Sequence, residues 1–142
     1  MTIYETDFYT WTQQQAAFLK ARLFENIDLD NLIEEIESMG RSEKRELESR
    51  LTVLLQHLLK WKYQPARRGT SWELTIDEQR IQFIKVLKDN PGLKNNLHQV
   101  LIDAYQLAVI KAAKETLLDK TTFPSECPWN LPQITNMDFF PE

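Results

Sequence analysis

Apolar side chains recur at intervals of three and four residues along most of this chain, and this spacing constrains the fold more than any other feature. Residues three or four positions apart share one face of an α-helix, whereas a half-buried strand alternates them at every second position. Only three glycines occur in 142 residues, so the many tight turns of a sheet protein are hard to build. The pattern predicts an all-α fold, a single helical bundle of about five helices in one domain over residues 1–142.

Capping residues set the expected helix limits. The expected helices cover residues 12–23, 28–40, 42–63, then 71 or 75 to 90, and a fifth from 91 until the pattern breaks after about 119. Gly40 is expected to stop the second of these and Pro91 to open the last. Apolar residues in the second fall at i, i+3, i+4 and i+7, namely Leu29, Leu32, Ile33 and Ile36. The proline-rich C-terminal segment is also rich in aromatic side chains, so we expect it to be ordered and to wrap over the bundle.

The net charge is −4, but it is unevenly distributed. Residues 1–40 carry eight acidic and two basic side chains, whereas residues 41–68 carry eight basic and three acidic ones. Such blocks commonly pair within a molecule, so we expect the acidic first third to pack beside the basic middle third. A net negative charge repels nucleic acid, which argues against a nucleic-acid partner.

The cysteine content and the apolar runs bear on the compartment. Cys127 is the only cysteine, so no intramolecular disulfide can form, and a reducing cytoplasm is the expected location. No run of about 18 apolar residues occurs, and the first seven residues lack the features of a signal peptide. We therefore expect a cytoplasmic protein with no membrane partner.

Four polar residues form a candidate polar cluster: Glu34, Glu37, His57 and Arg80. Arg80 falls within the apolar face that Ile76 and Phe83 define, so it is expected to be buried with a carboxylate partner or an anionic ligand. His57 borders an apolar stripe, where a packed histidine and an acid–base group are both reasonable hypotheses. The chain has no His-Glu-x-x-His motif, so we expect no metal and no cofactor.

Basic and aromatic residues are interleaved in a candidate binding surface: Lys60, Trp61, Lys62, Arg67, Arg68 and Trp72. Phosphate contacts and base stacking use this composition. The alternative is that the tryptophans anchor the core while the cations are solvated. No known nucleic-acid-binding motif accompanies the surface.

Several short motifs appear in a recognisable order along the chain. They are Tyr4 with Asp7 to Trp11, Glu34 to Glu37, His57 to Trp61, Ser71-Trp72, Ile76 with Arg80, Tyr105 with Ala108, Glu115-Thr116, Phe123-Pro124 and Cys127-Pro128. Together they resemble the bacterial family called domain of unknown function 29, over nearly the whole chain. The resemblance implies a small all-helical domain and assigns no biochemical role.

Two functional hypotheses follow. The first is a binding or protein-interaction module whose surface includes the aromatic N-terminal residues and the basic loop around Arg67 and Arg68, with an unknown protein or a second copy as partner. The alternative is a hydrolytic enzyme in which Glu34, Glu37 and His57 form a carboxylate/histidine site and Arg80 binds an anionic substrate.

Overall fold

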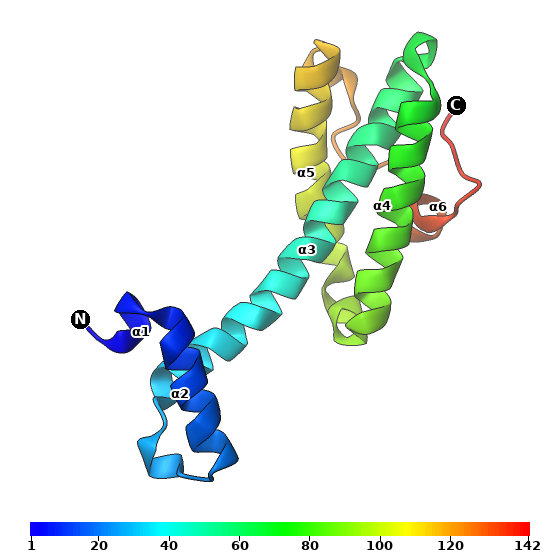
Figure 1. Cartoon of the computed structure of the whole chain (residues 1–142). Helices are drawn as coiled ribbons and strands as arrows, with labels where there is room; N and C mark the ends of the chain where they lie inside the picture. The colour runs from blue at the N-terminus through cyan, green and yellow to red at the C-terminus, as the bar shows by residue number, and fades with distance from the viewer. The chain divides into compact units, whose positions relative to one another are not determined.

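The computed structural model describes residues 1–142 and contains helices and turns but no strand, which confirms the all-α prediction (Figure 1). In chain order the elements are α1 (Ile3–Thr6), α2 (Phe8–Lys20), η1 (Phe24–Asn26), α3 (Leu29–Tyr63), η2 (Pro65–Arg67), α4 (Thr70–Asp89), η3 (Pro91–Asn96), α5 (Leu97–Thr116), η4 (Lys120–Thr122) and α6 (Leu131–Thr135). The η elements are short 3₁₀ turns. None of the helices combines the length and the apolar character needed to cross a membrane.

The chain forms two compact units, Met1–Ser42 and Glu43–Glu142, called here the first and the second unit. The helix α3 begins in the first unit and ends in the second. A single domain over the whole chain stays a prediction.

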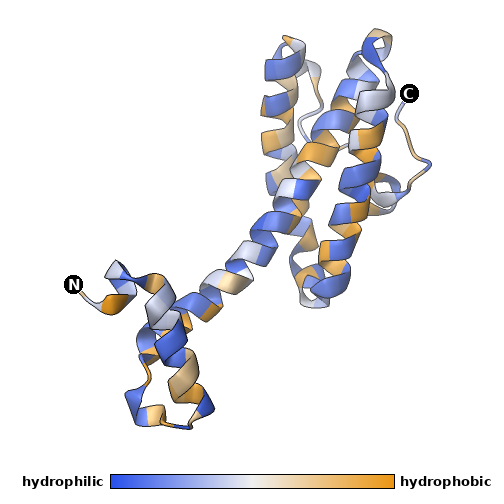
Figure 2. Cartoon of the chain, viewed as in Figure 1, coloured by the Kyte–Doolittle hydropathy of each residue, from blue (hydrophilic) through white to orange (hydrophobic).

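The core of the second unit lies among the C-terminal part of α3, α4 and α5. Six leucines of α3 have no exposed surface, namely Leu47, Leu51, Leu54, Leu55, Leu58 and Leu59. They pack with Ile76 and Phe83 of α4 and with Val100 and Ala108 of α5. Figure 2 shows the matching hydrophobic bands on these helices. Each fully buried leucine stabilises the fold by about 1.5–3 kcal/mol, so this three-helix contact dominates the stability of the unit.

The C-terminal segment, residues 117–142, is ordered and packs on the second unit, as its aromatic content predicts. Its side chains Phe123, Trp129 and Ile134 are buried in the core. The Tyr105 hydroxyl of α5 donates a hydrogen bond of 2.7 Å to the Pro124 carbonyl. Asn130 and Gln133 form a reciprocal capping box that starts α6. The segment is therefore held both by apolar burial and by hydrogen bonds.

The predicted stop at Gly40 is wrong, because α3 continues through this residue for 35 residues in all. Gly40 does not adopt the positive φ of a helix-ending glycine. The apolar stripe also stays in phase, since Ile36 and Leu47 are about three helical turns apart. Arg41 forms an ion pair with Glu37 one turn before it, on the far side of Gly40. Local pairing and a continuous stripe outweigh the weak helix propensity of one glycine.

Three other helix limits differ from those predicted. The helix α2 begins at Phe8 rather than Thr12, because the Asp7 side chain accepts a hydrogen bond from the Thr10 amide and caps the helix. Gly69, rather than Ser71 or Thr75, is the N-cap of α4. Pro91 opens the 3₁₀ turn η3, and α5 begins only after it.

Candidate functional site

Arg80 of α4 is fully buried, as its position in the apolar face predicts. Its guanidinium donates hydrogen bonds to three backbone carbonyls of the C-terminal segment, those of Ile134 at 2.8 Å, Met137 at 3.4 Å and Phe139 at 2.6 Å. Burial lowers the pKa of this group from its ordinary value. Backbone carbonyls thus take the place that the sequence analysis gave to a carboxylate, and Arg80 joins α4 to the C-terminal segment.

Glu34 and Glu37 of the candidate polar cluster lie in the first unit. Both pair with Arg41, with N–O distances of 2.9 Å for Glu34 and 3.9 Å for Glu37. All three side chains are more than half exposed. Exposed pairs of this kind contribute about 0–1 kcal/mol and leave the carboxylates accessible to solvent.

His57 lies on α3 in the second unit. Its Nδ1 is 2.8 Å from the Val53 carbonyl, and since a carbonyl only accepts, Nδ1 carries the proton in this contact. Burial lowers the pKa of the imidazole and so favours its neutral form. None of the four predicted residues has another of them as a hydrogen-bond or ion-pair partner. The structure also contains no group of three or more His, Cys, Asp or Glu side chains that could hold a metal ion.

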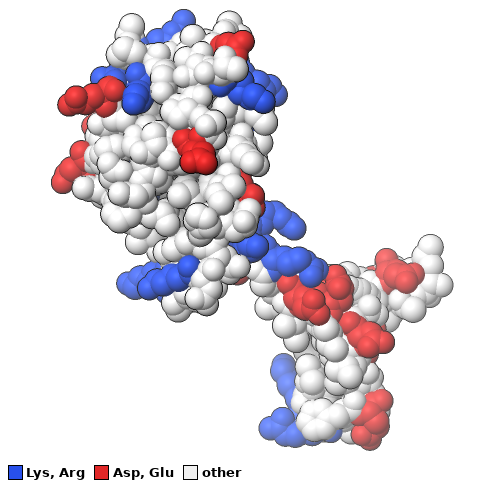
Figure 3. Space-filling view, turned by 180° about the vertical axis from the view of Figure 1, so that it is seen from behind, with Lys and Arg blue, Asp and Glu red and all other residues white.

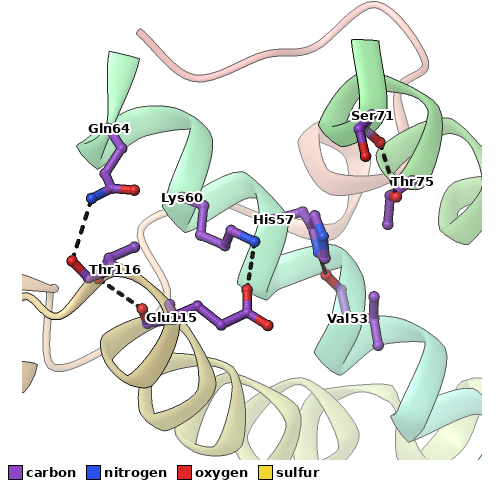
Figure 4. Close-up of polar contacts among 9 residues, drawn as sticks. Val53, His57, Lys60, Gln64, Ser71, Thr75, Glu115 and Thr116 are labelled. Carbon is purple, nitrogen blue, oxygen red and sulfur yellow. Dashed lines mark hydrogen bonds and ion pairs between the residues drawn. The ribbon is translucent and has the colours of Figure 1, made fainter. Parts of the chain in front are cut away.

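A different polar cluster forms beside His57 (Figure 4). The Lys60 ammonium of α3 forms an ion pair of 2.5 Å with the Glu115 carboxylate of α5. The same ammonium lies 4.7 Å from the centroid of the Trp72 ring of α4. Lys60 is buried, so its charge needs both partners. This contact joins all three helices of the core through one cation.

The electrostatics of Glu115 reflect two opposing effects. Burial raises the pKa of its carboxyl. The hydrogen bond and the charge of Lys60, with smaller contributions from Gln56 and His57, lower this pKa by more than burial raises it, so the net pKa is below its ordinary value. Glu115 is therefore a carboxylate at neutral pH. No local pattern predicts Glu115 as a site residue, because it lies 55 positions from Lys60 and no spacing rule connects the two. Only the family resemblance had singled it out.

Most of the candidate binding surface is already occupied by contacts within the second unit. The Arg68 guanidinium donates to the Trp61 carbonyl at 2.7 Å and to the Pro141 carbonyl at 3.3 Å, and it lies 5.3 Å from the Trp61 ring centroid. The Trp61 ring in turn packs against Phe140, with centroids 4.8 Å apart. Lys60 pairs with Glu115 and lies over the Trp72 ring. The remaining cations are Lys62, over the Tyr63 ring, and the exposed Arg67.

The first unit has a small interior. Trp11 and Gln15 of α2 are its only buried side chains. The Trp11 indole donates to the Asp28 carboxylate at 3.0 Å, and the Gln15 side chain accepts from the Asp28 amide at 2.7 Å. The ring of Tyr4 packs edge-on against Trp11, with centroids 4.6 Å apart, and its hydroxyl donates to Glu35, which raises the pKa of Tyr4 to about 12. These contacts hold α1 and α2 against the start of α3.

The apolar stripe on the first turns of α3 is exposed. Leu29, Ile33, Ile36 and Met39 have exposed fractions of 57%, 45%, 65% and 67%. The sequence pattern identified this face as apolar, and amphipathic faces usually point to a core. Leu32 of the same face is half-buried, and the other four side chains are left uncovered by the rest of the unit. The rings of Phe8, Tyr9 and Phe24 in the same unit are also exposed.

Acidic side chains border this apolar surface on one edge. The first unit carries eight acidic and three basic residues, and Figure 3 shows several of the acidic ones gathered on one face of it. Asp30, Glu34 and Glu37 follow one edge of the exposed stripe on α3. The first unit therefore combines an exposed apolar stripe with a negative electrostatic field.

Comparisons with known proteins agree with the resemblance found in the sequence. Residues 3–140 match the family described as "Domain of unknown function DUF29", which is nearly the whole chain. The comparisons with curated proteins and with solved structures gave no match. The motifs that carried the resemblance include His57, Trp72 and Glu115, which meet at the core cluster around Lys60. The chain belongs to the DUF29 family.

Proposed function

We propose that this protein is a protein-interaction module in which the first unit binds the partner and the second unit is the folded scaffold. The observation that carries the proposal is the exposed apolar stripe of α3, from Leu29 to Met39. Contiguous exposed apolar surface is rare on monomeric proteins and commonly marks an interaction site. The function is assigned to binding because the exposed side chains are apolar and carry no reactive group.

The size of the first unit supports the same proposal. A segment of about 40 residues rarely buries enough apolar surface to be stable without a metal, a disulfide or a partner. The first unit has two buried side chains, and only one of them, Trp11, is apolar. The unit contains no cysteine. A partner that covers the stripe would supply the burial that the unit lacks.

The basic loop of the second unit is a weaker candidate for binding a partner. Its basic and aromatic side chains, which the sequence analysis considered as a binding surface, are mostly engaged with one another and with the C-terminal segment. If these side chains turned to bind a partner, they would give up contacts that hold residues 139–141 in place. We therefore assign the basic loop to folding and the first unit to binding.

In-cell photo-cross-linking tests the proposal. A benzoylphenylalanine replaces Ile36 in the first unit or, as the control, Ile81 on α4, which is similarly exposed at 57%. We expect a discrete protein adduct from position 36, none from position 81, and loss of the adduct when Ile33→Asp is added. If position 36 gives no adduct above that of position 81, the interaction function is wrong.

A further inference from the structure

We propose that the partner presents a basic amphipathic helix, which packs on the exposed stripe of α3 beside α2. This inference rests on the proposed function and names the chemistry of the partner. The bound helix would carry apolar residues at helical spacing with Lys and Arg on both flanks. Two features of the first unit support the proposal, its incomplete helix packing and its charge.

The helix packing identifies the shape of the partner. The apolar stripe of α3 keeps its phase from Leu29 to Leu58, because Ile36 and Leu47 are about three turns apart. In the second unit this same stripe is covered by two helices, α4 and α5. In the first unit the contacts of α1 and α2 leave Leu32 half-buried, and Leu29, Ile33, Ile36 and Met39 keep 45–67% exposure. One added helix would cover these turns in the way that α4 and α5 cover the later ones.

The charge identifies the composition of the partner. Eight acidic residues against three basic ones give the first unit a negative field. A second copy of the chain would bring the same acidic side chains against Asp30, Glu34 and Glu37, and like charges in one interface are unfavourable. An anionic membrane is repelled for the same reason. A basic amphipathic helix would bury its apolar side chains against the stripe, and its Lys and Arg side chains would be attracted to the acidic residues of the first unit.

Four basic residues of this chain are engaged by groups of their own unit. Arg41, Arg50, Lys60 and Arg68 already pair with groups of their own unit. A basic helix of another protein would supply positive charge that these four cations do not offer to the acidic surface.

Peptide binding to the full-length chain tests the inference. The probes are two synthetic peptides of about 18 residues, long enough to cover the stripe as a helix. They share the same leucine positions and differ in their flanking residues, which are Lys and Arg in one and Glu in the other. Fluorescence anisotropy should show that the basic peptide binds at least about tenfold more tightly, and that its affinity falls as salt is raised.

Matched variants separate docking on the stripe from non-specific attraction. Ile36→Asn and Ile81→Asn remove one exposed isoleucine each without changing the net charge. We expect Ile36→Asn to weaken binding of the basic peptide about tenfold, and Ile81→Asn to leave it unchanged. Equal effects of the two variants would show attraction by charge alone and would overturn the inference.

Other outcomes also decide against the basic helix. Equal affinity for both peptides, no binding of either, or a homodimer that Ile36→Asn disrupts would each overturn it. A cross-link from position 36 to the second unit of the same chain would assign the stripe to an internal contact and overturn it as well. If the basic peptide fails while position 36 still captures another protein in cells, the interaction function stands and only the chemistry of the partner is wrong.

Discussion

Replacement of Arg80 by methionine should destabilise the second unit strongly. Methionine keeps much of the apolar volume but removes all three hydrogen bonds to the C-terminal segment. The bonds to Ile134 at 2.8 Å and Phe139 at 2.6 Å are short and charge-assisted, and each is worth about 1.5–3 kcal/mol. The bond to Met137 at 3.4 Å contributes little. Removing a buried guanidinium returns part of its desolvation cost, so we expect a net loss of about 3 kcal/mol.

Denaturant unfolding followed by tryptophan fluorescence measures this loss directly, because Trp129 of the C-terminal segment is buried in the native state. Hydrogen exchange over residues 131–142 should show that this segment opens first. Arg80→Lys should lose less than Arg80→Met, because one ammonium can keep a single carbonyl contact. The control is Arg50→Met, which removes a surface pair with Glu46 at 3.6 Å and should cost less than about 1 kcal/mol. A loss below about 1 kcal/mol for Arg80→Met would refute the assigned role of Arg80.

Three further predictions concern single residues. Gly40→Ala should raise the free energy of unfolding by about 0.5–1 kcal/mol, because Gly40 lies inside α3 and has free space for a Cβ atom. A variant that is less stable than the parent would instead indicate that a helix ends at this position. Burial lowers the pKa of His57 below its unfolded value of 6.5, so the unfolded chain binds more protons just below pH 6.5 and stability should fall as the pH drops through that range. His57→Gln should flatten this slope in urea unfolding curves, and an unchanged slope would contradict the prediction. Partial burial also raises the pKa of the Cys127 thiol, so a thiol reagent at neutral pH should label the native protein at least about tenfold more slowly than the unfolded chain, and equal rates would contradict this protection.

Local sequence patterns were sufficient for the fold class and for part of the site. Helical spacing of apolar residues is a property of neighbouring positions, so it predicted the helices without knowledge of their packing. The same spacing placed Arg80 in an apolar face, and the structure confirms its burial. The aromatic content of the C-terminal segment likewise predicted an ordered wrap, because exposed aromatic rings are unfavourable in water.

Only the tertiary structure decided which groups meet. Every residue has a backbone carbonyl, so nothing in the sequence singles out those of Ile134 and Phe139, which lie 54 and 59 positions from Arg80. The pairing of Lys60 with Glu115 depends in the same way on how α3 packs on α5. Amphipathic spacing showed that the first turns of α3 have an apolar face, but exposure depends on which other elements cover that face. In the first unit α2 leaves it uncovered, and this outcome of packing is the basis of the proposed function.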